Sequence, residues 1–328
     1  MRIFRITLTV LLSGVIIFTL LFGVGKIGEK PSPVIREGYK GILTLWHIDS
    51  FEGGQGSRKQ FLLDTAVGFE KKNDGVLVMV VSYTAAGVKD NFEKGIFPDM
   101  LSFGNGVSVA NAQPLSTKRT HISGMVNADA YFTPWCRGGY ALIKNPKFSN
   151  EQTVSDLLVS QAEFTQPLTA FYGSGYIAKS VRVKKPMDAY IEFVSGKTPY
   201  FLGTQRDIHR LNSRGMEYEL TCLEGYNDLF QYIAVTSTDT VKSVYSQSFV
   251  EYLMSDTVQK KLDRIGMFSV FTSVDYDNQN LCAMQNAEYK RTVSAFTSAE
   301  ELRYLQSLSA LAVTGDTEAQ IKLKNIWL

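Results

Sequence analysis

The chain has 328 residues, a length that allows two domains or one large one. With 45% hydrophobic, 12% aromatic and 20% charged residues it can build a substantial core, which excludes a disordered chain or a fibre. The net charge of +2 comes from Arg2 and Arg5, because the rest of the chain carries equal numbers of basic and acidic side chains. A neutral chain argues against nucleic-acid binding, which rests on a basic excess.

The N-terminus carries an uncharged run of 20 residues, 6–25, which at 1.5 Å per residue matches the roughly 30 Å of bilayer hydrocarbon. Arg2 and Arg5 precede this run, so the positive-inside rule predicts that the residues after it face the outside. The run ends in FGVGKIGEK, without the small-residue pattern of a cleavage site, which favours an uncleaved anchor over a signal whose removal would release the protein. We therefore expect an anchor over 1–25 and a stalk over 26–40.

Strand and helix patterns alternate after the stalk. The run 41–47 is typical of a buried strand, and a glycine-rich loop over 48–56 follows it. Ser57 and Gln60 form a capping-box signal that predicts a helix over 57–72, and the apolar run 76–81 predicts a second buried strand.

The alternation continues with a helix over 85–94 and a strand over 99–103, which indicates an α/β domain. Shorter, aromatic and glycine-rich segments then extend to about residue 232. Further elements are predicted after these segments: helices over 246–254 and 257–265, a short strand over 267–270, and two amphipathic helices from residue 298. The pattern predicts an α/β domain interrupted by a second domain and then resumed.

Motifs for catalysis or cofactor binding are weak. The loop from Gly53 to Lys59 lacks the glycine before lysine that a P-loop needs, and it lacks the third glycine of a dinucleotide site. Ser174 lacks the flanking glycine of a nucleophile elbow, and Asp49 and Glu52 are too close in sequence to indicate a glycosidase pair. We expect neither an enzyme nor a cofactor.

The few cysteines and histidines are scattered along the chain. No spacing typical of a zinc site occurs, and at most one disulfide is possible, so neither a metal centre nor a disulfide framework is expected. The residues concerned are Cys136, Cys222, Cys282, His47, His121 and His209.

Loops that follow the predicted strands combine aromatic rings with polar side chains. Ligands of open α/β sheets bind at the carboxyl ends of strands, and aromatic faces beside amides, carboxylates and a guanidinium suit an uncharged polyhydroxy ligand. In this hypothesis three aromatic residues stack on the ligand, while Arg206 and the acids hold its hydroxyls; an Arg206–Asp207 ion pair of purely structural role is the alternative. The candidate residues are Trp46, Asp49, Ser50, Glu52, Tyr83, Asn105, Trp135, Tyr172, Arg206 and Asp228, of which Trp46, Trp135 and Tyr172 would stack.

Three segments within residues 41–272 are distinctive: LWHIDSFEGG, GTQRD and VEYLMSDTVQKKLDRIGMF. Through them, residues 41–272 resemble the extracellular solute-binding proteins of carbohydrate ABC importers. It implies the periplasmic-binding-protein type II fold, which has two α/β lobes joined by a hinge around a ligand cleft. The implied lobes are 41–105 with 235–328, and 106–234, with crossings near 104–107 and 234–238.

The resemblance also implies a function. The protein would capture a sugar or oligosaccharide in the cleft and deliver it to ABC permease subunits, as a monomeric ectodomain held at the outer face of the membrane by its N-terminal helix. No lipobox cysteine is present, so the apolar helix would be the only tether. Two alternatives are a ligand-sensing subunit of a membrane kinase and, less favoured, a membrane-anchored glycan hydrolase.

Overall fold

The computed structural model describes residues 39–148 and 154–325. The anchor predicted over 1–25 and all but the end of the predicted stalk lie outside these residues. Within the described ranges, no helix combines the length and the apolar character needed to cross a bilayer.

A five-stranded sheet forms the core of the first lobe, in the order β2-β1-β3-β12-β6. The first three strands are parallel, and β12 runs antiparallel to both β3 and β6. A two-stranded ribbon of β4 (Met125–Val126) and β5 (Asp129–Ala130) is attached to this lobe. The strands of the sheet are β1 (Gly41–His47), β2 (Val76–Ser82), β3 (Met100–Phe103), β6 (Thr133–Arg137) and β12 (Phe230–Val235).

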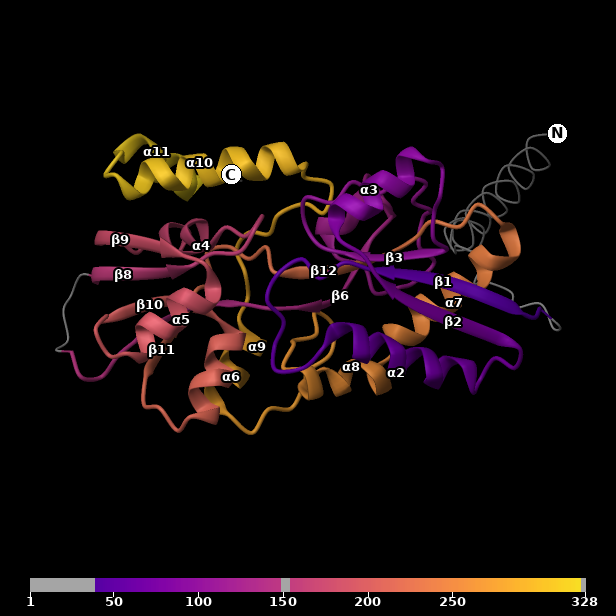
Figure 1. Ribbon diagram of the computed structural model, residues 1–328, viewed down its shortest axis with the longest axis horizontal. Coiled ribbons are helices and arrows are strands. Elements are labelled where there is room, and N and C mark those ends of the chain that lie inside the picture. Colours follow the sequence, from indigo (N-terminus) through magenta and orange to yellow (C-terminus); the bar gives the residue numbers. More distant parts are fainter. Residues whose placement is uncertain (1–38, 149–153, 326–328) are drawn as a thin grey trace, which may run out of the picture. The chain divides into compact units, whose positions relative to one another are not determined.

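Helices cover this sheet on both faces, because its strands are apolar on both sides. Leu43 and Val78 pack toward α2 and α7, whereas Trp46 and Leu101 on the other face pack with Val88 of α3. The helical segments of the lobe are α2 (Arg58–Glu70), α3 (Ala85–Glu93), η2 (Ile122–Gly124), α7 (Thr240–Leu253), α8 (Asp256–Gln259) and η3 (Lys260–Ile265). Figure 1 shows α2 and α8 on one side of the sheet and α3 on the other.

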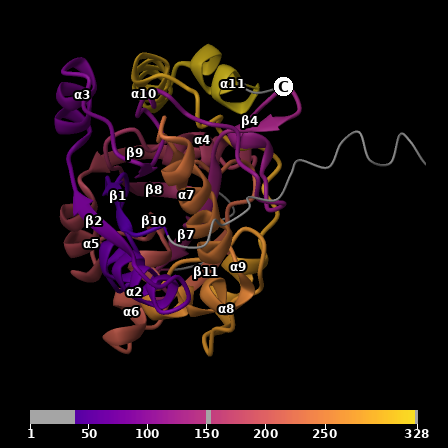
Figure 2. The same cartoon turned by 90° about the vertical axis from the view of Figure 1, so that its right-hand side faces the viewer.

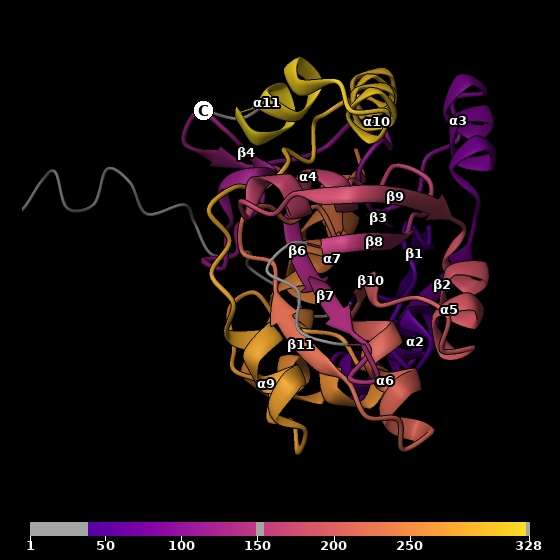
Figure 3. The ribbon, with the colours of Figure 1, turned by 90° about the vertical axis from the view of Figure 1, so that its left-hand side faces the viewer.

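The second lobe contains another five-stranded sheet, in the order β11-β7-β10-β8-β9. Strands β10, β8 and β9 are parallel, and β7 is antiparallel to its neighbours β10 and β11. Figure 3 shows these strands in succession, from β9 to β11. Their bounds are β7 (Tyr140–Lys144), β8 (Val154–Ser160), β9 (Ala178–Lys184), β10 (Tyr200–Thr204) and β11 (Glu219–Cys222).

Alternate residues of the second sheet contact different helices. Ile143 and Phe201 pack with α5, α6 and α9, whereas Leu142 and Leu202 on the opposite face belong to the cluster that contains α4, α10 and α11. The helices of the second lobe are α4 (Pro167–Gly173), α5 (Pro186–Val194), α6 (Gln205–Ser213), α9 (Gln279–Asn286), α10 (Ala299–Val313) and α11 (Thr317–Asn325).

The chain passes between the sheets at points other than those the sequence suggested. It leaves the first sheet at the end of β6 and enters the second after Gly138 and Gly139, and it returns in the segment 223–229 before β12. The expected crossings near 104–107 and 234–238 are therefore corrected. The reason is that residues 105–132 turn back onto the first lobe, where the backbone N–H of Gln113 donates to Val235.

The C-terminal helices also differ from the expected division, which assigned 235–328 to the first lobe. Helix α11 packs on α4, α10 contacts β9, and α9 contacts α6 and β11, so all three helices cover the second sheet. Figures 1 and 2 both show α10 and α11 beside α4. The apolar stripe of α10, with Leu302 and Leu305 buried, is used to complete the second lobe.

Local signals located most of the other elements. The predicted helix over 246–254 begins earlier, as α7 at Thr240, because the Asp239 carboxylate caps the backbone N–H groups of Val241 and Lys242. The predicted strand over 267–270 is reduced to one bridge between Arg137 and Phe268.

Candidate functional site

A cavity of about 820 Å³ is lined by residues of both lobes. The first lobe supplies α3 and the segment 106–108, and the second supplies residues 163–164 and the start of α10. Figures 2 and 3 both show α3 and α10 at the same end of the protein. The residues at its wall with aromatic, charged or hydroxyl groups are Thr84, Lys89, Phe92, Glu93, Ser108, Glu163, Phe164 and Arg303.

Aromatic packing holds Phe92 at the cavity wall. Helix α3 starts at Thr84, whose hydroxyl accepts a hydrogen bond from the Gly87 backbone, and Phe92 lies two turns further along. The Phe92 ring stacks on Trp46 with centroids 6.3 Å apart, and Trp46 in turn contacts Tyr83 at 4.4 Å. Trp46, a predicted stacking residue, and Tyr83, another residue of the predicted site, therefore lie directly behind the cavity wall.

Phe164 and Arg303 form the facing wall. Phe164 has a φ of +62°, an uncommon conformation for a non-glycine residue, in the turn between β8 and α4. The Arg303 guanidinium lies 5.5 Å from the Phe164 ring centroid, in a cation–π contact. Gly106, with a φ of +80°, leaves room for this wall, since a Cβ there would be 3.2 Å from both Phe164 and Leu302.

Asp228 lies where the chain returns to the first lobe, and it joins three segments. Its Oδ1 accepts a hydrogen bond from the Tyr140 hydroxyl at 2.6 Å, and its Oδ2 accepts one from the Gln166 backbone at 2.8 Å. Its carbonyl accepts a hydrogen bond from the side chain of Asn105. Burial raises the pKa of Asp228 to about 7, although the bonds from Tyr140 and Gln166 act in the opposite direction.

Gln166 connects this junction to the cavity. Its Nε2 donates to the Leu302 carbonyl of α10 at 3.0 Å, one residue before Arg303. The predicted residues Asn105 and Asp228 are therefore linked to the cavity through Gln166 and α10, and Asn105 also precedes the wall residue Gly106.

Ion pairs join the loop after β1 to α6 of the second lobe. Glu52 lies 3.3 Å from Arg210 and 3.6 Å from Arg206, and Arg206 also donates to the Gly54 carbonyl at 2.8 Å. Arg206 thus contacts the other lobe. The Arg206–Asp207 ion pair that the sequence offered as an alternative is not formed. Asp207 instead lies 3.3 Å from Arg210 and forms a capping box with Thr204.

Asp49 and Ser50 hold the same loop in place. Asp49 accepts from Arg58 Nε at 2.9 Å and lies 3.1 Å from His47. Burial alone would raise the pKa of Asp49, but the hydrogen bond from His47 and the charge of Arg58 lower it to about 2. Ser50 donates to the Gln231 side chain at 3.2 Å. Neither residue lines the cavity.

A buried hydrogen-bond chain fixes the tautomer of His47. Ser102 Oγ accepts from Trp135 Nε1 and from Gln231 Nε2, at 3.0 and 3.1 Å, so its own proton is directed to His47 Nδ1. His47 is then neutral and donates from Nε2 to Asp49, in keeping with a pKa that burial lowers. The serine, histidine and aspartate lie in a row, but Ser102 is fully buried and offers no surface to a substrate.

Trp135 and Tyr172 lie away from the cavity. Trp135 is 0% exposed and stacks on Phe61 of α2, and Tyr172 is 4% exposed beside Phe171 in the core of the second lobe. Their side chains present no open face on which a ligand could stack. In the described arrangement they belong to the hydrophobic core, in contrast to the stacking role expected from the sequence.

None of the residues predicted from the sequence lines this cavity, and its three most distinctive wall residues were therefore missed. Phe92, Phe164 and Arg303 come from segments far apart in the chain, and only the tertiary structure brings them to one cavity. A signal existed for Phe92 alone, because it follows Val88 at helical spacing on α3.

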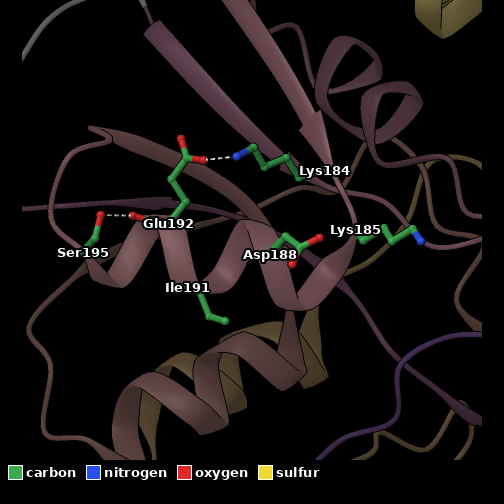
Figure 4. A pocket seen from close by; sticks show the side chains of 6 residues that line it. All are labelled: Lys184, Lys185, Asp188, Ile191, Glu192 and Ser195. Carbon is green, nitrogen blue, oxygen red and sulfur yellow. Dashed lines mark hydrogen bonds and ion pairs between the residues drawn. The ribbon is translucent and has the colours of Figure 1, made fainter.

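A second hollow, of about 620 Å³, lies beside α5 on the second lobe (Figure 4). Lys184 forms an ion pair with Glu192, and Ser195 donates to the Glu192 carbonyl, so three of the lining residues bond to one another. Because only one lobe contributes to it, we regard the cavity between α3 and α10 as the better candidate site.

Metal and disulfide chemistry have no site in the part of the chain that the structure describes. No group of three or more histidine, cysteine or acidic side chains is arranged to hold a metal ion there. Cys136, Cys222 and Cys282 are free thiols, so the single disulfide that the sequence allowed is not formed.

Comparison with known proteins shows similarity in structure. No protein-family model and no curated protein sequence matches the chain. Among solved structures, the GacH receptor of Streptomyces glaucescens, determined unliganded and with acarbose, has a TM-score of 0.61 at 14% identity, over 88% of this chain and 98% of that one. The galacto-N-biose/lacto-N-biose I-binding protein of a Bifidobacterium longum ABC transporter has a TM-score of 0.62 at 12% identity, over 88% and 96%.

The maltose-maltodextrin binding protein of Alicyclobacillus acidocaldarius is similar to the same degree, with a TM-score of 0.58 at 14% identity over 87% of this chain and 98% of that one. At these identities the likeness is one of fold. The expectation of a two-lobed α/β fold like that of the maltose-binding proteins is confirmed.

Proposed function

We propose that the protein is the substrate-binding component of an ABC importer and that it captures a saccharide in the cavity between α3 and α10. The cavity itself carries the proposal, because both lobes line it and it combines two aromatic rings with polar side chains. The fold supports the proposal, since the similar structures include sugar-binding proteins of transporters.

The cavity wall suits an uncharged polyhydroxy ligand. Phe92 and Phe164 offer apolar faces to the CH groups of a sugar ring, and Thr84 and Ser108 offer hydroxyls. The charged lining residues balance, because Lys89 and Arg303 oppose Glu93 and Glu163. Such a wall supplies hydrogen bonds without selecting for a charged ligand.

Capture would proceed by movement of the lobes about the three segments where the chain passes between them, 138–139, 223–229 and 266–278. A saccharide that contacts Phe92 of one lobe and Phe164 of the other binds the closed form more tightly than the open form, and this difference drives closure. Permease subunits would then recognise the closed form, and no covalent step is required.

We infer supporting roles for most residues of the sequence-based set. Trp46 and Tyr83 position Phe92, and Asn105 and Asp228 tie the first lobe to α10 through Gln166. The remaining polar residues, Asp49, Ser50, Glu52 and Arg206, hold the loop after β1 and its contact with α6.

The expected result of a binding screen is a rise in melting temperature with at least one of maltose, maltotriose, raffinose and chitobiose. Phe164→Ala should weaken the responding sugar about tenfold, because it removes one of the two apolar faces. Isothermal titration calorimetry measures this loss.

Tyr304→Ala is the matched control, since Tyr304 is an exposed aromatic residue of α10 next to Arg303 that does not line the cavity. Equal affinity in the Phe164 variant and the parent protein would contradict the assignment of this cavity. Turnover of any of the sugars would contradict a purely binding role.

We further propose that the apolar run 6–25 anchors the protein, as a monomer, at the outer face of the membrane, where it lies near its permease. The uncharged length of the run and the preceding Arg2 and Arg5 support this placement. Fractionation of cells that express the full chain should recover it with the membranes, and a chain that lacks residues 1–25 should not be exported. Full-length protein in the culture medium or periplasm would contradict anchoring.

A further inference from the structure

A separate cavity of about 310 Å³ lies where the loop after β1 meets α5 and α6. Gln55 of the first lobe contributes to its wall, together with Tyr190 of α5 and a row of arginines from α6. It shares no lining residue with the cavity between α3 and α10. Its function can therefore be considered independently of saccharide binding.

The lining charge of this cavity is positive. Arg206 and Arg210 lie four residues apart on one face of α6, Arg214 follows at the same spacing as its C-cap, and all three line the cavity. Glu52, which pairs with Arg206 and Arg210, and Asp207, which pairs with Arg210, are not at the wall. Burial lowers the pKa of the lining residue His209, so its ring is neutral at pH 7 and adds no charge.

Two hydrogen-bond donors at the wall are buried without partners. The Tyr190 side chain is 2% exposed, and its hydroxyl makes no hydrogen bond within the described residues. The Arg206 Nε–H is likewise buried and unbonded, at 3.6 Å from the nearest Glu52 oxygen. Burying such a donor without a partner costs free energy, unless a ligand or a water molecule accepts its hydrogen bond.

Two of the arginines contact the same aromatic ring. The guanidinium carbons of Arg210 and Arg214 are 5.1 and 5.3 Å from the Tyr190 ring centroid. Like charges four residues apart on a helix repel one another, and Arg214 has no ion pair in the described part of the chain to offset the repulsion. An anion at the wall would supply a compensating negative charge and would accept hydrogen bonds from the unpartnered donors.

We propose that this cavity binds a phosphate group through Arg206, Arg210, Arg214 and the Tyr190 hydroxyl. Guanidinium groups bind phosphate oxygens in bidentate fashion, and a tyrosine hydroxyl adds a neutral donor. The group is either the free ion or part of a small phosphorylated solute. Because Gln55 comes from the first lobe and the arginines from the second, the bound phosphate lies at the contact of the two lobes.

Calorimetric titration of the full-length protein at low ionic strength tests this site, with inorganic phosphate in one arm and glycerol 3-phosphate in the other. Saturable binding is expected in at least one arm, and it should weaken at high salt. Arg214→Gln should lower the affinity about tenfold and Tyr190→Phe about threefold, since they remove a charged and a neutral donor respectively. A preference for glycerol 3-phosphate would identify the ligand as a phosphorylated solute.

Arg264→Gln is the control for loss of charge alone, because Arg264 is exposed on η3 and does not line this cavity. The affinity of the Arg264→Gln variant for phosphate should match that of the parent protein. Absence of binding in both arms would overturn the proposal, as would an equal loss of affinity in the Arg264 and Arg214 variants. Unchanged melting temperatures of the variants without ligand show that they are folded.

Discussion

Replacing Trp135 with alanine is expected to lower the free energy of unfolding by about 4 kcal/mol. The indole is fully buried, stacks on Phe61 with centroids 5.6 Å apart, and donates from Nε1 to Ser102 at 3.0 Å. Its loss leaves a cavity between β6 and α2 and removes one donor from the hydrogen-bond chain at His47. Urea denaturation followed by circular dichroism measures the change.

Trp135→Phe separates the two contributions. It keeps a ring against Phe61 but removes the N–H donor, so its cost should be clearly smaller than that of alanine. Saccharide affinity, measured on the folded fraction, should change less than twofold in either variant. A normal unfolding free energy combined with a tenfold loss of affinity would instead favour the stacking role suggested by the sequence.

The second large effect is expected at Gly54, where the loop after β1 meets η3. A Cβ at this position would lie 2.1 Å from the Gly266 carbonyl oxygen and 2.2 Å from that of Ile265, and both are backbone atoms that cannot rotate away. Gly54→Ala should therefore cost about 3 kcal/mol and lower the melting temperature by roughly 6 °C or more. Differential scanning calorimetry measures this shift.

The neighbouring residue provides the control. A Cβ at Gly53 would have its nearest contacts at 3.6 and 3.8 Å, which are ordinary van der Waals distances. Gly53→Ala should leave the melting temperature within about 1 °C of the parent protein. Equal shifts in the two variants would mean that chain flexibility in this glycine-rich loop, and not the close approach to Gly266, sets its stability.

Sequence reasoning located the first lobe well because its elements carry local signals. The predicted strand over 41–47 coincides with β1, and the Ser57 cap places the start of α2 correctly, with its hydroxyl accepting from the Gln60 backbone. Such signals depend on a few adjacent residues. They are therefore readable without knowledge of the tertiary structure.

The division into lobes was harder to predict. The glycines at 104 and 106 resemble a linker, yet the crossing occurs at Gly138 and Gly139, between β6 and β7. Gly139 is fixed there by a hydrogen bond from its backbone N–H to Gln205 Oε1 at 3.0 Å. This contact joins residues far apart in sequence, so no local pattern reveals it.

The candidate site shows the same limit. Of the residues predicted at the carboxyl ends of strands, Trp46 and Tyr83 lie behind the wall of the proposed cavity. The wall itself also requires Phe164 from the turn before α4 and Arg303 from α10. Composition cannot distinguish these residues from others of their type, and it cannot show that Trp135 is enclosed.

The packing of α11 on α4 has a consequence for folding. Residues 317–325 cover a helix formed by residues 167–173, and the first lobe likewise needs α7, which follows the whole second sheet in the chain. Neither lobe is a continuous stretch, so neither can bury its apolar surface until late in synthesis. For a chain exported as proposed, we expect the first lobe to remain incomplete until η3 has emerged and the second until α11 has emerged, so that apolar surface stays exposed during passage.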